Sequence, residues 1–152
     1  MTEQASFRAP GAIERWFNRV FGVAAGFGVG LRHNYRLSVA GRQSGRIYST
    51  PVNLLVHEGR TYLVAPRGET QWVRNVRAGG VLRLKRGADE GIYRASELTG
   101  PQKTVVLREY LGRYTRTVQR YFEVTPDSSD AAFAEIAPRH PVFEVRRDAS
   151  AR

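Results

Sequence analysis

The chain has 152 residues, a length that fits a single folded domain. Apolar residues make up 41% and charged residues 25%, which excludes a wholly disordered chain. Because there is no cysteine and there are only three histidines, disulfides and cysteine nucleophiles are excluded and no metal site is expected.

The positive charge is concentrated in the first part of the chain. Residues 1–86 contain 14 Lys and Arg against 4 Asp and Glu, whereas residues 87–152 contain 10 of each. The net charge of +10 therefore predicts an anionic partner for the first part: nucleic acid, a membrane surface or a phosphorylated cofactor. The preference for arginine over lysine is by itself better explained by codon usage.

Apolar residues at helical spacing predict an amphipathic helix over residues 11–22, followed by a glycine-rich connection. We interpret 1–31 as this N-terminal segment, 32–147 as the folded domain and 148–152 as a tail. No apolar run reaches the ~20 residues that cross a bilayer, and no secretory signal is visible. We therefore expect a cytoplasmic protein, with the N-terminal helix as a candidate for peripheral membrane contact.

From Asn34 onward the apolar period changes to two, which predicts a strand over 34–40. The glycine-rich segment that follows predicts a turn, and further strands are expected at 46–57 and 60–65. Pro51 interrupts the second of these strands, which favours an edge position or a bulge there.

The later elements alternate between helices and strands. In order, we expect a helix at 71–78, strands at 81–86 and 92–98 around a turn at 87–91, a helix from Pro101 to Tyr114, a helix after a cap at 127–130, and a strand at 140–145. Thr70 is a candidate cap of the first helix, which Gly79 and Gly80 would end. Five or six twisted antiparallel strands must close or be covered, so we expect an α+β protein built on a barrel.

The turn Gly41–Arg46 is a candidate phosphate site. Its glycines expose backbone amides, Ser44 adds a hydroxyl, and Arg42 and Arg46 add positive charge. A solvated hairpin with basic residues explains the same pattern.

The segment 67–75 is a second candidate, because a helix that begins after a strand end attracts anions at its N-terminus. Trp72 and Asn75 lie on one face of that helix. Alternatively, Trp72 belongs to the core and Asn75 is a buried structural hydrogen-bonding residue.

Three tyrosines, Tyr110, Tyr114 and Tyr121, are candidates for lining a planar ligand or donating a proton. A helix that packs aromatic side chains on a sheet gives the same pattern. Neither a serine nucleophile motif nor a catalytic triad order is present, so a cofactor would have to carry any chemistry.

Four segments taken together resemble the deazaflavin-dependent nitroreductase family, which comprises split β-barrel flavin and deazaflavin oxidoreductases of actinobacteria. They are Leu37–Arg46, Ser49–Leu55, Tyr62–Gly68 and Gln71–Asn75, and the C-terminal segments at 133–137 and 140–145 are also similar to the family. The resemblance implies a split β-barrel of the FMN-binding, pyridoxamine-phosphate-oxidase-like type, with about six antiparallel strands, an N-terminal helix and flanking helices.

The resemblance further implies coenzyme F420 as the cofactor, with FMN or FAD as the alternative, and hydride transfer from the reduced deazaflavin to a quinone, nitro compound or enone. In such a reaction we expect Tyr110, Tyr114 or Tyr121 to protonate the product, and by analogy with other split barrels a homodimer is a further expected partner. The cofactor-binding residues carried over are Arg42, Gln43, Ser44, Gly45, Arg46, Pro51, Val52, Asn53, Ala65, Pro66, Arg67, Gly68, Trp72 and Asn75.

Two positions depart from the family pattern. The family usually has a basic residue where this chain has Gln43, and another is common near Tyr48. These departures leave open a non-catalytic carrier of the same fold for another flavin, a planar tetrapyrrole or a lipid, and, as a lesser alternative, a nucleic-acid-binding protein.

Overall fold

The computed structural model describes residues 34–151 of the chain. The helix expected at 11–22, the glycine-rich connection and the membrane contact expected of that helix lie outside the described residues. None of the described helices is long and apolar enough to span a bilayer.

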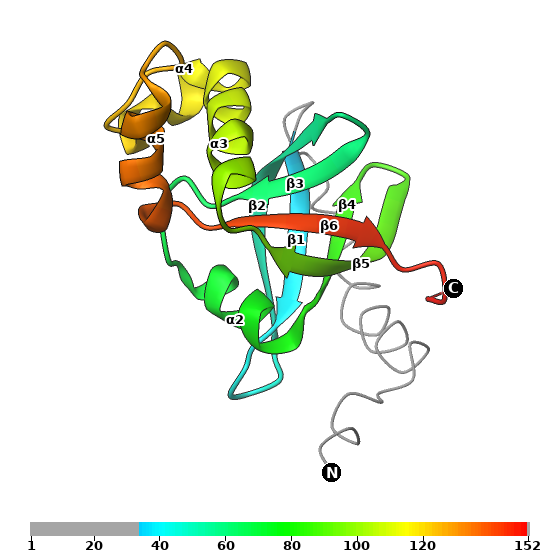
Figure 1. The fold of residues 1–152 in the computed structure, drawn as a ribbon. Helices are drawn as coiled ribbons and strands as arrows, with labels where there is room; N and C mark the ends of the chain where they lie inside the picture. Colours follow the sequence, from blue (N-terminus) through cyan, green and yellow to red (C-terminus); the bar gives the residue numbers. More distant parts are fainter. Residues whose placement is uncertain (1–33, 152) are drawn as a thin grey trace.

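The described residues form six strands with helices between them (Figure 1). The strands are β1 (Asn34–Ala40), β2 (Ile47–His57), β3 (Arg60–Val64), β4 (Val81–Arg86), β5 (Asp89–Glu97) and β6 (Val142–Arg147). The helices are α2 (Gln71–Gly79), α3 (Pro101–Arg113), α4 (Thr115–Val118) and α5 (Asp130–Ile136), with short 3-10 turns η3 (Gln119–Tyr121) and η4 (Ala137–Arg139).

The six strands close into an antiparallel barrel in the order β1-β2-β3-β6-β5-β4. Pairing of β1 with β4, from Arg36 opposite Lys85 to Ser38 opposite Arg83, completes the ring. Closure pairs most of the sheet edge, which is the physical reason for expecting a barrel from this many strands. The predicted α+β barrel of about six antiparallel strands is confirmed.

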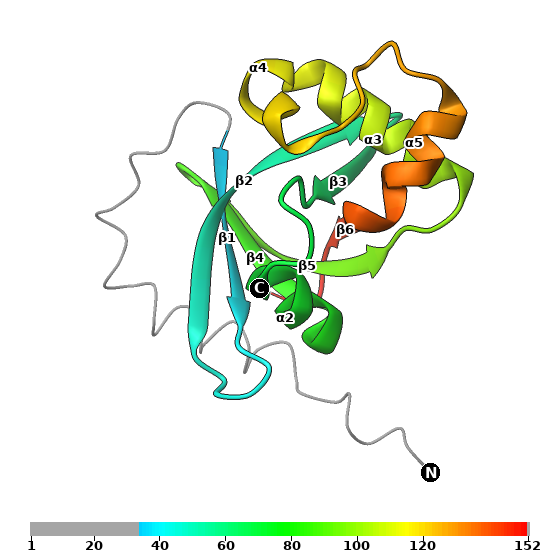
Figure 2. The same cartoon turned by 90° about the vertical axis from the view of Figure 1, so that its left-hand side faces the viewer.

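Two apolar cores hold the helices to the barrel. The first fills the barrel itself, where residues from the strands, among them Leu37, Leu84 and Phe143, meet Val73 and Val76 of α2. The second lies between the outer face of the barrel and the helices and includes Leu55, Tyr62, Tyr110, Leu111 and Phe133. Consequently α2 closes one end of the barrel, while α3, α4 and α5 cover one side of it (Figures 1 and 2).

Strand β2 changes its neighbour halfway along. Residues 47–53 pair with β1, and residues 54–57 pair with β3. Among the described residues, the first half of β2 therefore has a strand partner on one edge only. Pro51 lies in this half, where a missing amide costs no ladder bond, so its predicted edge position is confirmed.

The turn expected at 87–91 is shorter than predicted, because β5 already begins at Asp89. Gly87 takes the positive φ that the tight turn requires. Gly91 is a strand residue opposite Leu84, and a side chain there would collide with the guanidinium of Arg147. This glycine makes room for a neighbouring side chain and has no role in the turn.

Two other boundaries differ from the expectations. Thr70 occupies the cap position of α2, but its side chain makes no capping hydrogen bond. The last strand begins at Val142 rather than at 140: the carbonyl of Pro141 still accepts from the amide of Ala65 at 2.8 Å, but proline has no amide with which to continue the ladder. The end of α2 is as predicted: Gly80 has φ 69° and its amide donates to Val76.

Candidate functional site

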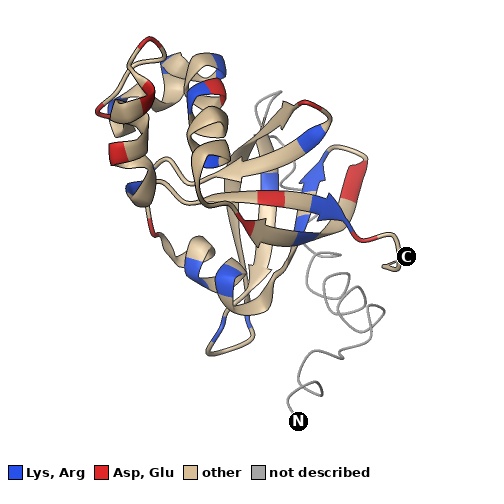
Figure 3. Ribbon diagram, in the orientation of Figure 1, with Lys and Arg blue, Asp and Glu red and all other residues tan. Residues whose placement is uncertain are grey.

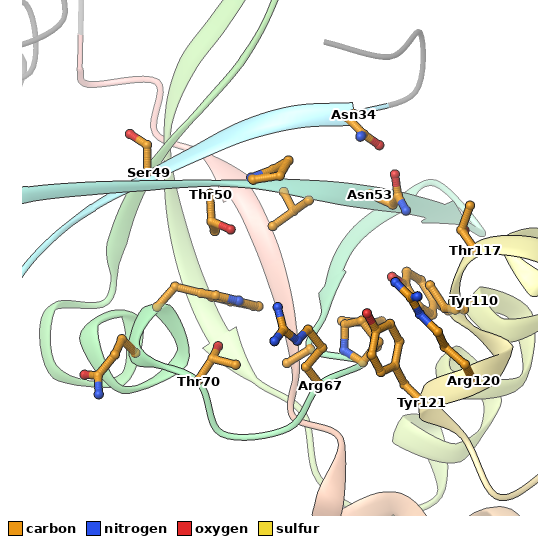
Figure 4. A pocket seen from close by; sticks show the side chains of 18 of the residues that line it. Asn34, Ser49, Thr50, Asn53, Arg67, Thr70, Tyr110, Thr117, Arg120 and Tyr121 are labelled. Carbon is orange, nitrogen blue, oxygen red and sulfur yellow. The ribbon is translucent and has the colours of Figure 1, made fainter.

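One cavity of about 570 Å³ lies between the first half of β2, the start of α2 and the segment α3 to η3 (Figure 4). We call it the β2 cavity. Its lining residues are Asn34, Tyr48, Ser49, Thr50, Pro51, Val52, Asn53, Val64, Ala65, Pro66, Arg67, Thr70, Gln71, Trp72, Tyr110, Thr117, Val118, Arg120 and Tyr121.

The cavity follows the open edge of β2. Successive side chains of a strand point to opposite faces, yet all residues from 48 to 53 line the cavity. That arrangement requires the cavity to lie along the edge of the strand rather than over one face. The edge without a strand partner among the described residues thus faces a ligand-sized space, and its backbone groups are available for hydrogen bonds.

The charge on the cavity wall has one sign. Of the residues that the structure describes, Arg67 and Arg120 are the charged ones in the lining, and no carboxylate of residues 34–151 belongs to it. Among the described residues, Arg67 makes no ion pair or hydrogen bond with its side chain. A site with two guanidinium groups and no acidic residue favours an anionic ligand.

The end of the cavity near α2 carries further groups that suit an anion. The helix begins there with no acidic residue in its first turn, so the free amides and the dipole at its N-terminus favour a negatively charged group. The Oγ1 atom of Thr70 is buried and has no hydrogen-bond partner among the described residues. A buried hydroxyl without a partner is costly and is satisfied when a ligand supplies one.

Trp72 belongs both to the cavity wall and to the core. Its ring packs on Phe143 at 6.0 Å between centroids with a tilt of 53°, and it lies against the core that fills the barrel. That contact fixes the indole so that it presents a rigid apolar surface to the cavity. The two interpretations drawn from the sequence, core residue and ligand wall, therefore describe the same side chain.

The turn 41–46 lies beside α2 but outside the cavity lining. The Oδ1 atom of Asn75 accepts hydrogen bonds from the backbone amide of Arg42 at 3.1 Å and from its guanidinium at 2.9 Å. Arg42 also donates to Gln71 at 3.0 Å. Asn75 is 3% exposed and acts as the structural link between the turn and the helix.

Other parts of the turn remain open. Ser44 accepts from the amide of Arg46 at 3.2 Å, and Gly45 takes φ 72°. Gln43, Ser44 and Gly45 are exposed, and the guanidinium of Arg46 has no partner among the described residues. Figure 3 shows basic residues on both this hairpin tip and α2, which lie at the same end of the molecule.

His140 holds the loop that follows β3, which contains Pro66 and Arg67, through contacts with its backbone. Its Nδ1 atom lies 3.0 Å from the carbonyl oxygen of Pro66, and its ring stacks on Phe122 at 4.2 Å. Burial lowers the pKa of His140, so the neutral ring donates to Pro66 from Nδ1. Gly68 has φ 86°, and a side chain there would press on the carbonyl of Arg139. These contacts place Pro66 and Arg67 on the cavity wall.

The three candidate tyrosines differ in position. Tyr114 lies outside the lining, and its hydroxyl donates to the carbonyl of Leu54 at 2.5 Å. Tyr110 lines the cavity, but only 2% of its surface is exposed. Burial raises the pKa of Tyr110, and a hydrogen bond from Asn53 lowers it by less. Tyr121 extends into the cavity, and its hydroxyl has no hydrogen-bond partner among the described residues (Figure 4).

The fold thus brings together part of the predicted site. The predicted site residues that lie in the cavity wall are Pro51, Val52, Asn53, Ala65, Pro66, Arg67, Trp72, Tyr110 and Tyr121. The predicted site residues that lie outside the wall are Arg42, Gln43, Ser44, Gly45, Arg46, Gly68, Asn75 and Tyr114. Lining residues that sequence reasoning did not propose include Asn34, Thr50, Thr117 and Arg120. Arg120 carries no signal in the sequence, because only the fold brings η3 to the edge of β2.

Comparison with known families gives one match that covers most of the chain. The sequence profile of a family described as F420H(2)-dependent quinone reductase matches residues 14–125. No protein with a curated function matches the chain.

Several solved structures share the fold at low sequence identity. One is described as F420-H2 dependent reductase FDR-A: it is 20% identical, the match covers 78% of this chain and 100% of that one, and the TM-score is 0.55. A second, described as a domain-swapped dimer, is 20% identical over 87% and 98% of the two chains with a TM-score of 0.58. A putative pyridoxamine 5'-phosphate oxidase from Listeria innocua is 12% identical over 90% and 94%, with a TM-score of 0.53. These likenesses establish the split-barrel fold.

Proposed function

The chain belongs to the F420H2-dependent quinone reductase family, and we propose that it reduces a quinone in the β2 cavity. Family membership makes it an F420-dependent oxidoreductase with coenzyme F420 as its cofactor, as its resemblance to deazaflavin-dependent reductases implied. The observation that carries the proposed location is the cavity itself, a space of ligand size along the open edge of β2 with two arginines and no carboxylate in its wall.

The residues present fit a planar, anionic cofactor. The volume of about 570 Å³ is typical of small-molecule sites. Trp72 and Tyr121 supply aromatic surface for a ring, and Arg67 supplies a cation without a competing partner among the described residues. The unpartnered hydroxyl of Thr70, next to the free amides of α2, adds a donor for an acidic group. The polar groups left unsatisfied therefore match the chemistry of F420, which is a phosphorylated molecule.

The acidic end of the cofactor is proposed to lie toward α2 and the turn 41–46. Within the described part of the chain, the guanidinium groups of Arg46 and Arg67 have no partner on that side, whereas Arg42 is held by Asn75 and Gln71. The uncharged Gln43 is exposed in the same turn, so it removes one cation without removing the site. We keep Arg46, Ser44 and Gly45 as the proposed contacts of the turn.

When bound, reduced F420 supplies a hydride, and one proton then completes the two-electron reduction of a quinone to its hydroquinone. The chain must provide or conduct that proton. Tyr121 is the proposed donor because its hydroxyl lies in the cavity without a competing hydrogen bond among the described residues. Tyr110, whose pKa is raised by burial, stays protonated and serves as a hydrogen-bond donor beside Asn53.

Binding and turnover test the proposal together. Titration with oxidised F420, followed by its fluorescence, is expected to give a micromolar Kd or better, with FMN binding more weakly. F420H2 oxidation by 1,4-naphthoquinone, followed by absorbance, is expected to be catalytic. Arg67→Ala is expected to raise the Kd for F420 roughly tenfold, which is the usual loss for a charge-assisted hydrogen bond.

The control for Arg67→Ala is Arg116→Ala, which removes an exposed arginine of α4 that is not part of the lining. This control should leave F420 binding unchanged. Absence of binding at high micromolar F420, or catalysis with FMN in preference to F420, contradicts the proposed function.

A second copy of the chain is a further proposed partner. The support is a structure of the same fold that is described as a domain-swapped dimer. Light scattering after size-exclusion chromatography is expected to give twice the chain mass of 17.1 kDa. A mass of one chain at all concentrations would contradict a homodimer.

A further inference from the structure

Arg120 brings a cation to the end of the β2 cavity that lies farthest from α2. It belongs to η3, which follows α4, and its side chain lies beside Tyr110 and across the cavity from Thr70 (Figure 4). The acidic part of the cofactor is proposed to lie at the α2 end. The guanidinium of Arg120 is therefore free of the cofactor's acidic groups and available to bind the electron acceptor.

The backbone around Arg120 is held in place from both sides. Val118 and Phe122, which flank η3, are 4% and 7% exposed and belong to the core under the helices. The side chain of Gln119 donates to the carbonyl of Val124 at 2.8 Å. The guanidinium lies over the ring of Tyr121, 4.8 Å from its centroid, a cation–π contact that restricts its rotamers. Arg120 is therefore an exposed cation whose backbone is held by the core and whose guanidinium is restricted by the ring of Tyr121.

Among the described residues that line the cavity around Arg120 there are hydrogen-bonding groups but no acidic residue. Asn34, Asn53, Thr117 and the hydroxyl of Tyr110 line this end of the cavity. Among the described residues, Arg120 makes no ion pair, and two carboxylates of the helical layer are bound to other arginines, Asp130 to Arg108 and Glu123 to Arg139. No described side chain neutralises Arg120, so the positive potential is directed at whatever enters the cavity.

On the basis of the proposed function, we infer that Arg120 selects electron acceptors that carry an acidic group on or next to the reducible ring. A guanidinium binds a carboxylate or sulfonate through two parallel hydrogen bonds, which both attracts and orients it. Stacking on Tyr121 aligns the planar group with a flat ring. The substrate class is then an anionic quinone-like compound, with the acidic group held at Arg120 and the reducible ring toward Tyr121.

The test compares one neutral and one anionic acceptor of the same ring system, 1,4-naphthoquinone and 1,4-naphthoquinone-2-sulfonate. For each, kcat/KM of F420H2 oxidation is measured with the wild type, Arg120→Ala, Arg120→Lys and the control Arg116→Ala. Arg120→Ala is expected to lower the ratio of sulfonated to neutral kcat/KM roughly tenfold, the loss expected for a charged hydrogen bond at a partly solvated site. Arg120→Lys should restore part of the ratio, and Arg116→Ala should retain it.

A binding measurement separates recognition from catalysis. Calorimetric titration of 1,4-naphthoquinone-2-sulfonate into the protein loaded with oxidised F420 involves no electron transfer. The Kd is expected to rise roughly tenfold in Arg120→Ala, while the Kd for F420 itself stays within a factor of two.

The possible results distinguish this inference from the proposed function. An equal loss of kcat/KM for both acceptors, an unchanged ratio, or a marked weakening of F420 binding by Arg120→Ala overturns the inference and leaves the reductase function standing. A wild type that oxidises F420H2 with neither quinone overturns the proposed function and the inference with it.

Discussion

At the residue scale, the three tyrosines show how position separates side chains of the same chemistry. The hydroxyl of Tyr114 donates a hydrogen bond to the carbonyl of Leu54, and the hydroxyl of Tyr110 is buried beside Asn53. Tyr121 combines access to the cavity with a hydroxyl that has no partner among the described residues. A proton donor needs both properties, because its proton must reach the substrate without first breaking a structural hydrogen bond.

Tyr121→Phe is therefore expected to lower kcat for quinone reduction by ~10- to 100-fold, the lower range for loss of a general acid. The Kd for F420 should change little, since the aromatic ring is retained. Steady-state kinetics with F420H2 provide the measurement. Tyr114→Phe is the comparison: it should cost about 1 kcal/mol of stability and reduce kcat much less. Equal loss of kcat in the two variants would contradict the assignment of Tyr121.

His140 gives the stability of the protein a pH dependence. Because burial lowers the pKa of His140, the unfolded chain takes up a proton more readily than the folded one. The free energy of unfolding is then expected to be flat above about pH 7.5 and to fall as the pH drops below the unfolded value of about 6.5. In His140→Asn, which retains a donor for Pro66, the protein should be less stable at pH 8 and less sensitive to pH. Urea unfolding at several pH values measures both; an unchanged slope in the variant would count against His140.

At the element scale, the hairpin tip between β1 and β2 depends on α2 for its conformation. The tip has few contacts of its own beyond the backbone bonds from Gly41 to Arg46 and from Gly45 to Gly41. Asn75 of α2 accepts two hydrogen bonds from Arg42 and is itself buried. A segment proposed to contact the cofactor is thus held by a helix whose own N-terminus lines the cavity.

Asn75→Ala is expected to destabilise the protein by about 1–3 kcal/mol, because the Arg42 amide loses its acceptor in a partly buried place. Chemical denaturation measures this loss. Arg74→Ala is the matched control from the same helix, since Arg74 is half-exposed and its contact with Glu69 is long, at 4.0 Å. If Asn75→Ala were no more destabilising than Arg74→Ala, the link between turn and helix would carry little energy.

At the scale of the whole molecule, the uneven charge follows the position of the cavity. Residues 32–86 contain 11 Lys and Arg against 2 Asp and Glu, and they include β1, β2, the hairpin tip, the loop with Arg67 and α2. Several of these arginines form ion pairs within the protein; Arg77, for example, pairs with Glu69 and Glu97. Arg46 and Arg67, which make no ion pair among the described residues, lie toward the proposed acidic end of the cofactor, so they attract an anion to that end of the cavity.

This distribution predicts that F420 binding is sensitive to salt. Raising the NaCl concentration from about 50 mM to about 500 mM shortens the screening length severalfold, so the Kd for F420 is expected to rise roughly tenfold. FMN, which carries a single phosphate, should show a smaller rise. Fluorescence titrations at several salt concentrations provide the measurement, and a Kd independent of salt would contradict electrostatic attraction.

The sequence determined most of the fold. Alternating apolar residues and turn-forming glycines located the six strands, and Pro101 and Gly80 marked helix ends, because these features act through local backbone conformation. The predicted boundaries of elements were wrong where a contact with a residue far along the chain determined the structure. Gly91 is the example, because it lies in a strand and its lack of a side chain makes room for Arg147 of another strand. The resemblance in motifs led to the cofactor, which the family match established.

Only the tertiary structure decided which candidates share one site. Closing the barrel makes β2 exchange β1 for β3 at residue 54, and this exchange opens the edge along which the cavity runs. The same packing turns Asn75 toward the hairpin tip, takes Tyr114 out of the lining, and brings Arg120 to the cavity from the second part of the chain, whose net charge is zero. Local spacing cannot specify these relations, because they depend on contacts between residues that are far apart along the chain.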